Sequence, residues 1–220
     1  MSEPAPLRAV VFDFDGTLID SLPLVLAAIR HALEPFGGRP TMDIFASLGG
    51  PPERFLLGLL NDARHLPVAL ERLHAFHREN AHLIQPYEGA RLLLQQLNTL
   101  GVPSALWTGR DRESTGWLLQ QHGLEGFFAA IVCGDDLASH KPDPAGLREI
   151  LRRLDVSPKA TLLVGDADVD VLGGVACGVD TLLIRHARDI ELHVASQSWR
   201  MVTSPREAFE LVLSRVGKFS

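Results

Sequence analysis

Short apolar runs recur along the chain, and their spacing constrains the fold more than any other feature of the sequence. They cover residues 8–12, 103–107, 130–133, 161–164 and 181–184, with segments of helical periodicity between them. The first run does not alternate strictly between apolar and polar residues, which is typical of a strand covered by helices on both faces. Strands that alternate with helices in this way predict βαβ units and a doubly wound parallel α/β sheet of the Rossmann-like class.

Residues 22–83 interrupt this alternation. They contain amphipathic segments at residues 24–33, 55–60 and 69–83, and no recognisable strand. Because the stretch begins just after the first strand and closes near Pro86, we expect a helical insertion over the carboxyl end of that strand. The sequence therefore predicts an α/β core from residues 1–18 and 86–220, with an α-helical cap at residues 19–85.

Composition and charge exclude several classes of function. No apolar run of the 220-residue chain reaches the roughly 18–20 residues of a membrane span. A formal net charge of −6 without a basic block argues against nucleic acid as a partner. The N-terminal residues show no basic region followed by an apolar stretch, so we expect a cytoplasmic location. The sequence does not distinguish a monomer from a homodimer.

Acidic residues follow two of the apolar runs. Asp13 and Asp15 come directly after the first run, and Asp166, Asp168 and Asp170 come after the fourth. The carboxyl ends of parallel strands meet at one edge of a sheet, so these carboxylates should converge. At an effective dielectric constant near 20, two carboxylates about 4 Å apart repel by about 4 kcal/mol, so the group needs a cation. A site made of oxygen ligands favours Mg²⁺. Not every acid need belong to it, because Asp168 could simply cap the helix that begins there.

Two further strand ends carry groups that suit an anion. Thr108 and Gly109 follow the second run and offer a hydroxyl group and an unhindered backbone N–H just before a helix. Lys141 follows the third run, in a loop that two prolines stiffen. Taken singly, these residues have ordinary interpretations, as a helix cap and as a surface lysine.

Taken in chain order, the segments D-x-D-G-T, T, K and G-D-x-x-x-D resemble the motifs of the haloacid dehalogenase-like superfamily over nearly the whole chain. The position of the helical insertion is similar to that in members with a small α-helical (C1-type) cap. The dipeptide Asp20-Ser21, which follows the first motif, is similar to the sequence at this place in the phosphoglycolate phosphatase branch. The resemblance implies Mg²⁺-dependent hydrolysis of a small phosphorylated metabolite, of which a phosphoglycolate-type phosphomonoester is favoured.

The same resemblance implies roles for the acidic residues. Asp13 would attack phosphorus and form an aspartyl-phosphate, and Asp15 would act as general acid and then general base. Asp13 and Asp166 would bind Mg²⁺ through carboxylate oxygens, Asp15 through its backbone carbonyl, and Asp170 through a supporting contact.

The resemblance also implies the substrate contacts. The Thr108 hydroxyl, the Gly109 N–H and the Lys141 ammonium would hold the phosphoryl oxygens. Arg54, near the start of a cap segment, is a candidate for binding a substrate carboxylate or second anionic group, and an exposed surface arginine is an equally good interpretation. The triplet Thr-Gly-Arg at residues 108–110 departs from the Thr or Ser followed by Asn of many relatives, which could alter substrate preference.

Three other functions share features of this pattern. A sugar-phosphate mutase of the β-phosphoglucomutase type keeps both aspartates but usually has a polar residue twelve positions after the nucleophile, where this chain has Val25. A dehalogenase lacks an acid–base residue at the position of Asp15. A non-enzymatic phospho-receiver domain uses Asp, Thr and Lys on a similar sheet, but it is shorter and has no cap. Phosphatase is therefore the preferred interpretation, and mutase is the alternative.

Overall fold

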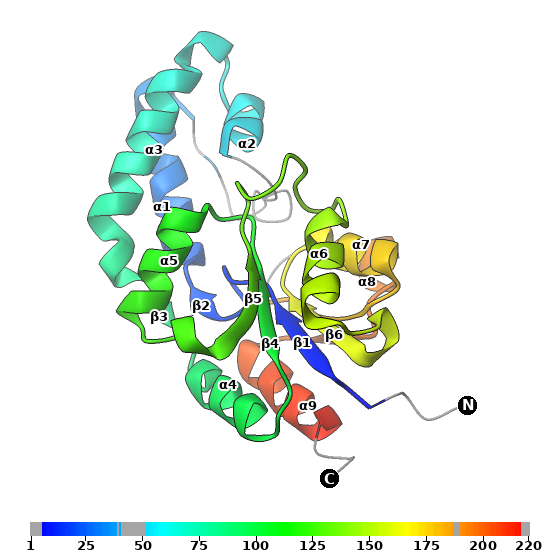
Figure 1. Ribbon diagram of the computed structural model, residues 1–220. Coiled ribbons are helices and arrows are strands. Elements are labelled where there is room, and N and C mark those ends of the chain that lie inside the picture. Colours follow the sequence, from blue (N-terminus) through cyan, green and yellow to red (C-terminus); the bar gives the residue numbers. More distant parts are fainter. Residues whose placement is uncertain (1–5, 39, 41–51, 187–189, 217–220) are drawn as a thin grey trace.

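A six-stranded parallel sheet forms the centre of the protein. The computed structural model describes residues 6–38, 40, 52–186 and 190–216. Within them the strand order is β5-β4-β1-β6-β7-β8 (Figure 1). The strands are β1 (Ala9–Phe12), β4 (Ser104–Trp107), β5 (Phe128–Val132), β6 (Thr161–Gly165), β7 (Asp180–Ile184) and β8 (Arg200–Val202). The five predicted strands are all present, and β8 is an additional edge strand.

Helices cover both faces of this sheet (Figure 1). One face carries α4 (Ala90–Thr99), α5 (Arg112–Gln121) and α9 (Pro205–Val216), and the other carries α6 (Ala145–Leu154), α7 (Asp168–Cys177) and α8 (Leu192–Ala195). Within β1, Val10 and Phe12 pack toward the first group, whereas Val11 packs toward α6. Burial on both sides explains why the strand reads as a continuous apolar run. The predicted doubly wound α/β class is confirmed.

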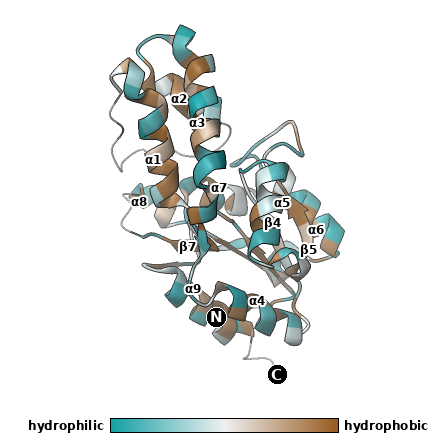
Figure 2. Cartoon of the chain, turned by 90° about the vertical axis from the view of Figure 1, so that its left-hand side faces the viewer, coloured by the Kyte–Doolittle hydropathy of each residue, from teal (hydrophilic) through white to brown (hydrophobic). Residues whose placement is uncertain are grey.

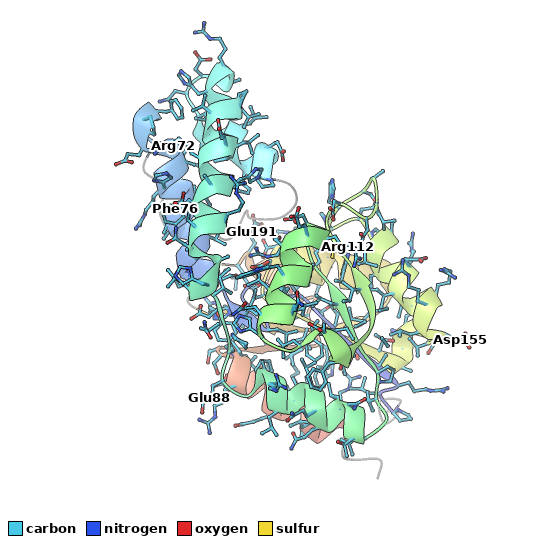
Figure 3. All side chains as sticks on the ribbon, turned by 60° about the vertical axis from the view of Figure 1, so that its left-hand side comes forward. Arg72, Phe76, Glu88, Arg112, Asp155 and Glu191 are labelled. Carbon is cyan, nitrogen blue, oxygen red and sulfur yellow. The ribbon has the colours of Figure 1, made fainter. Side chains whose placement is uncertain are left out.

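Three helices project beyond the carboxyl edge of the sheet (Figures 1 and 2). These cap helices are α1 (Leu22–Leu33), α2 (Pro52–Leu59) and α3 (Leu66–Asn80), and they share a small apolar core. Arg72 joins α3 to α1, because its Nη2 donates a hydrogen bond to the carbonyl oxygen of His31 in α1 at 2.8 Å (Arg72 is labelled in Figure 3). Two short strands, β2 (Ile19–Asp20) and β3 (Gln85–Pro86), pair antiparallel where the chain leaves the core and returns to it.

Single turns of 3₁₀ helix complete the described structure. They are η1 (Glu34–Phe36), η3 (Ala63–His65), η4 (Ala81–Leu83), η5 (Glu125–Phe127) and η6 (Pro158–Ala160). No helix in the described ranges combines the length and the apolarity needed to cross a membrane.

Candidate active site

A tight turn after β1 brings the first two aspartates to the carboxyl edge of the sheet. The backbone N–H of Asp13 continues the parallel ladder by donating to the carbonyl oxygen of Val164 at 2.8 Å. Gly16 then adopts a left-handed conformation with φ of 78°. A Cβ atom at Gly16 would lie 2.0 Å from Asp166 Oδ2, so only glycine lets the turn approach this carboxylate. The Gly16 turn therefore positions the loop after β1 against the loop after β6.

Three of the predicted acids form a buried cluster, which we call the acidic cluster: Asp13, Asp166 and Asp170. Each offers a carboxylate oxygen within 4.8 Å of the others, and none is more than 7% exposed. Lys141 lies against this cluster, with its Nζ 2.7 Å from Asp13 Oδ1 and 2.6 Å from Asp170 Oδ1. The structure thus brings together residues from three separate strand ends.

The electrostatics of the acidic cluster favour an additional cation. Burial raises the pKa of Asp13 to about 7; Lys141 opposes this shift and Asp170 adds to it. Burial also disfavours the Lys141 ammonium, but its two acidic neighbours outweigh this effect and raise its pKa. One ammonium therefore contacts two of the three close carboxylates, and a donor set made only of oxygen atoms fits Mg²⁺.

Packing beneath Lys141 fixes where its ammonium can lie. Its Nζ is 4.7 Å from the centroid of the Trp107 ring, within the range of a cation–π contact. Trp107 in turn fits between α6 and α7 because both helices have a glycine against it. A Cβ at Gly146 or Gly173 would lie 2.3 Å or 2.5 Å from atoms of the indole. The ring is 3% exposed and forms a floor under the site.

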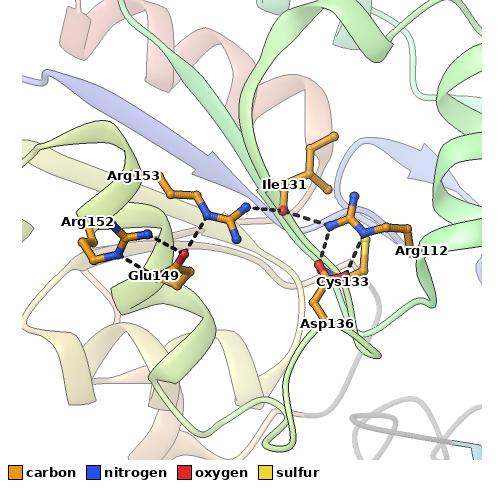
Figure 4. Close-up of polar contacts among 7 residues, drawn as sticks. All are labelled: Arg112, Ile131, Cys133, Asp136, Glu149, Arg152 and Arg153. Carbon is orange, nitrogen blue, oxygen red and sulfur yellow. Dashed lines mark hydrogen bonds and ion pairs between the residues drawn. The ribbon is translucent and has the colours of Figure 1, made fainter.

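The loop after β4 forms the next wall of the site. Thr108 is 2% exposed, and its Oγ1 accepts the backbone N–H of Arg110 at 3.1 Å. Gly109 lies against the loop after β5, where a Cβ at Gly134 would approach the Gly109 carbonyl oxygen to 2.2 Å. An ion pair between Arg112, the first residue of α5, and Asp136 of the loop after β5 holds these two segments together at the surface (Figure 4).

Asp15 does not belong to the acidic cluster and instead pairs with Arg110. The Arg110 Nε and Nη2 atoms donate to the two carboxylate oxygens at 3.0 Å and 2.5 Å. Burial opposes ionisation of Asp15, but the guanidinium outweighs it and holds the pKa of Asp15 below its usual value. The two residues are 95 positions apart and both follow strands of the sheet, but their pairing was not predicted.

A family model described as haloacid dehalogenase-like hydrolase matches residues 10–184, most of the chain. The chain belongs to the haloacid dehalogenase-like hydrolases. Pyrophosphatase PpaX from Halalkalibacterium halodurans is 31% identical over 189 residues, covering 82% of this chain and 85% of that protein. A phosphoglycolate phosphatase from Pseudomonas putida is 34% identical over 198 residues, covering 84% and 73%.

Solved structures show the same fold. A haloacid dehalogenase-like family hydrolase from Streptococcus pneumoniae superposes with a TM-score of 0.79 at 20% identity, covering 94% of this chain and 98% of that one. At such low identity the likeness concerns the fold alone. It extends over nearly the whole chain and so includes both the sheet and the described cap helices.

Two histidines of this haloacid dehalogenase-like hydrolase reach the site without having been predicted. His186 Nε2 lies 2.6 Å from the Gly16 carbonyl oxygen and 4.0 Å from Asp166 Oδ2. His186 follows β7, so the strand-end rule that selected the aspartates could also have found it. His77 comes from cap helix α3, and burial followed by the Arg110 charge lowers its pKa to about 4. His77 is therefore neutral near pH 7.

Two other predictions have different outcomes. Asp168 is the first residue of α7 and not its N-cap, so the capping interpretation was wrong for Asp168. Asp170, the third residue of α7, caps the helix instead, because its Oδ2 accepts the backbone N–H groups of Ala167, the N-cap residue, at 3.1 Å and of Asp166 at 3.2 Å. Arg54 belongs to helix α2, but its side chain lies outside the described part of the chain, so its substrate role stays a prediction.

Proposed function

We propose that this haloacid dehalogenase-like hydrolase is a Mg²⁺-dependent phosphatase of small phosphomonoesters that uses Asp13 as its nucleophile. The observation that carries the proposal is the Asp13 carboxylate, buried at a strand end between an ammonium group and two further acids. Such a carboxylate is oriented by Lys141 and needs a second cation to stay ionised. An attacking carboxylate and the positive groups around it are the parts that phosphoryl transfer requires.

In the proposed mechanism, each residue acts from the place described above. An Asp13 oxygen attacks phosphorus as the bond to the leaving alkoxide breaks. Asp15 gives that alkoxide a proton, which it must first take up on leaving the Arg110 guanidinium, because this pairing holds the pKa of Asp15 low. Asp15 then takes a proton from the water that hydrolyses the aspartyl-phosphate. Lys141, the Thr108 hydroxyl and the Gly109 N–H hold the phosphoryl oxygens, where negative charge gathers.

Four acidic residues would hold the Mg²⁺ ion. Asp13 and Asp166 would supply carboxylate oxygens, Asp15 its backbone carbonyl, and Asp170 a supporting contact. When bound, the ion neutralises charge on the acids and on the transferring phosphoryl group. Gly16 approaches Asp166 so closely that no Cβ atom would fit between them. This close approach supports the assignment, because it brings the two loops near enough to share one ion.

The relatives narrow the proposed substrate class. The names of the two relatives above contain pyrophosphate and phosphoglycolate. Both compounds carry a second anionic group close to the phosphoryl group that is cleaved. We propose the same class for this chain, with a phosphoglycolate-type metabolite favoured. We also propose that residues 19–85 form the cap and that residues 1–18 and 86–220 form the core. A cytoplasmic location stays a prediction.

A sugar-phosphate mutase is the less favoured alternative. Val25 lies in α1 and packs against the apolar core of the cap helices, so this position offers no group for proton transfer. A phospho-receiver role would leave the cap helices without a purpose.

Steady hydrolysis of p-nitrophenyl phosphate tests the proposed function. Wild-type protein with Mg²⁺ should release phosphate over many turnovers, EDTA should stop the release, and restored Mg²⁺ should recover it. Asp13→Asn should abolish turnover while the far-ultraviolet circular dichroism spectrum stays unchanged. Normal hydrolysis by Asp13→Asn would remove Asp13 from the mechanism, and a single phosphorylation without release would favour the receiver role.

A further inference from the structure

Arg110 lies in the site with its charge directed at another active-site residue. Its side chain is 12% exposed, and its Nε and Nη2 atoms meet both oxygens of Asp15. This fork is the geometry in which a guanidinium binds any planar carboxylate or a phosphoryl group. The described structure therefore contains a preformed receptor for an anion, and the Asp15 carboxylate occupies it.

The position of this receptor relates it to the leaving group. A general acid approaches the oxygen that it protonates to about 2.6–3.2 Å. The Arg110 nitrogens are 2.5 Å and 3.0 Å from the Asp15 oxygens. The guanidinium is therefore within about 6 Å of the leaving oxygen, or two hydrogen-bond lengths. An anionic group one or two bonds beyond that oxygen can reach Arg110, whereas the phosphoryl group itself is held on the Lys141 side.

The cap helices supply a second group at the same place. His77 of α3 has a buried Nδ1 that meets no hydrogen-bond partner among the residues the structure describes. The Arg110 charge lowers the pKa of this imidazole and the Asp15 charge raises it, so His77 is near enough for both charges to act on it. A buried polar atom without a partner is costly, so a ligand that accepts a hydrogen bond here would relieve that cost.

We propose that Arg110 selects substrates that carry a second anionic group next to the leaving oxygen. Until such a substrate binds, the Asp15 carboxylate occupies the guanidinium fork of Arg110. This inference rests on the proposed phosphatase function. The substrate anion takes the guanidinium fork, and His77 contacts the same anion from the cap side. Asp15 is thereby released to face the leaving oxygen. A substrate with a neutral leaving group leaves Arg110 on Asp15 and is turned over less efficiently.

A matched pair of substrates tests this selection. 2-Phosphoglycolate and 2-hydroxyethyl phosphate have similar size, but only the first has a carboxylate beyond the leaving oxygen. The readout is the ratio of their kcat/KM values. Wild-type enzyme should favour phosphoglycolate, and Arg110→Gln should lower the ratio by about 10- to 100-fold, the effect of losing hydrogen bonds to a charged group. Pyrophosphate, as a third substrate, shows whether the fork also accepts a phosphoryl group.

Arg112→Gln is the control variant. Arg112 is two positions away, half exposed, and paired with Asp136 at the surface (Figures 3 and 4). It should keep the wild-type ratio. If Arg110→Gln loses activity toward both substrates, Arg110→Lys decides, because lysine keeps the charge but not the fork; a wild-type ratio in that variant would contradict the proposal.

Two further results would overturn the inference while leaving the phosphatase function intact. One is a wild-type enzyme without preference between the two substrates. The other is an active Arg110→Gln variant with an unchanged ratio. The phosphatase function fails separately, if wild-type protein with Mg²⁺ releases no phosphate from either substrate.

Discussion

Replacing Gly16 with alanine should disrupt the acidic cluster without unfolding the protein, and a second glycine provides the matched control. Gly16 and Gly101 both have left-handed backbones, with φ of 78° and 69°. The new Cβ of Gly16→Ala would lie 2.0 Å from Asp166 Oδ2, about 1.4 Å short of the 3.4 Å at which ordinary contact begins. At Gly101, nothing lies within 4 Å. Both variants therefore share the backbone strain, and only one displaces a carboxylate.

The two effects have different magnitudes. A left-handed alanine costs about 1–2 kcal/mol, which lowers the melting temperature of a protein of this size by about 2–8 °C. Gly101→Ala should show this loss and little else. Gly16→Ala must also move the Asp166 carboxylate, and Mg²⁺ tolerates little departure from a metal–oxygen distance of about 2.0–2.1 Å. A displacement of about 1 Å in a catalytic group costs about 100-fold in rate.

Two assays separate the variants. Thermal melts with and without Mg²⁺ should show a metal-dependent rise for wild type and Gly101→Ala and a much smaller rise for Gly16→Ala. Hydrolysis of p-nitrophenyl phosphate should fall at least about 100-fold in Gly16→Ala only. The reasoning is refuted if Gly16→Ala keeps both the metal-dependent rise and the activity, or if Gly101→Ala loses them equally.

Three further predictions concern packing, charge and pH. Gly146→Ala forces a Cβ to within 2.3 Å of Trp107 and should lower the free energy of unfolding in urea by about 1–3 kcal/mol, whereas Gly116→Ala, with open space, should raise it by about 0.5–1 kcal/mol. Lys141→Met removes the ammonium between two buried carboxylates and should lower kcat at least about 100-fold, with a lower melting temperature that added Mg²⁺ partly restores. The pKa of His77 is about 4 in the folded protein against 6.5 ordinarily, so between these values the unfolded chain binds a proton that the folded chain does not. The free energy of unfolding should therefore fall as pH drops from 6.5 to 4. In urea melts, His77→Asn should reduce the slope of this free energy against pH by up to about 1.4 kcal/mol per pH unit.

The sheet was predictable because its strands are buried on both faces and end abruptly at polar residues. The edge strand β8 escaped prediction for the opposite reason. It has three residues, and Met201 at its centre is 47% exposed, so no apolar run marks it. The two-residue strands β2 and β3 are likewise too short to leave a periodic pattern. They are defined by pairing across 64 intervening residues, which a local pattern cannot contain.

Convergence of the strand-end residues was predictable for a related reason. Parallel strands place their carboxyl ends at one edge, so Asp13, Asp166 and Lys141 could be assigned to one site from their positions after apolar runs. The same rule would have added His186 had it been applied after the last predicted run. His77 could not be found this way, because its place depends on how α3 packs over the sheet.

Which cation faces which acid could not be read from the sequence, because it depends on side-chain reach. Lys141 bridges Asp13 and Asp170, whereas Arg110 faces Asp15. This division leaves the three carboxylates of the acidic cluster with oxygen atoms within 4.8 Å of one another, and a single ammonium contacts two of them. At an effective dielectric constant near 20, each additional close pair costs about 4 kcal/mol, comparable to the whole stability of a marginal domain. A divalent ion removes that repulsion, because it can bind oxygen atoms of several carboxylates at once.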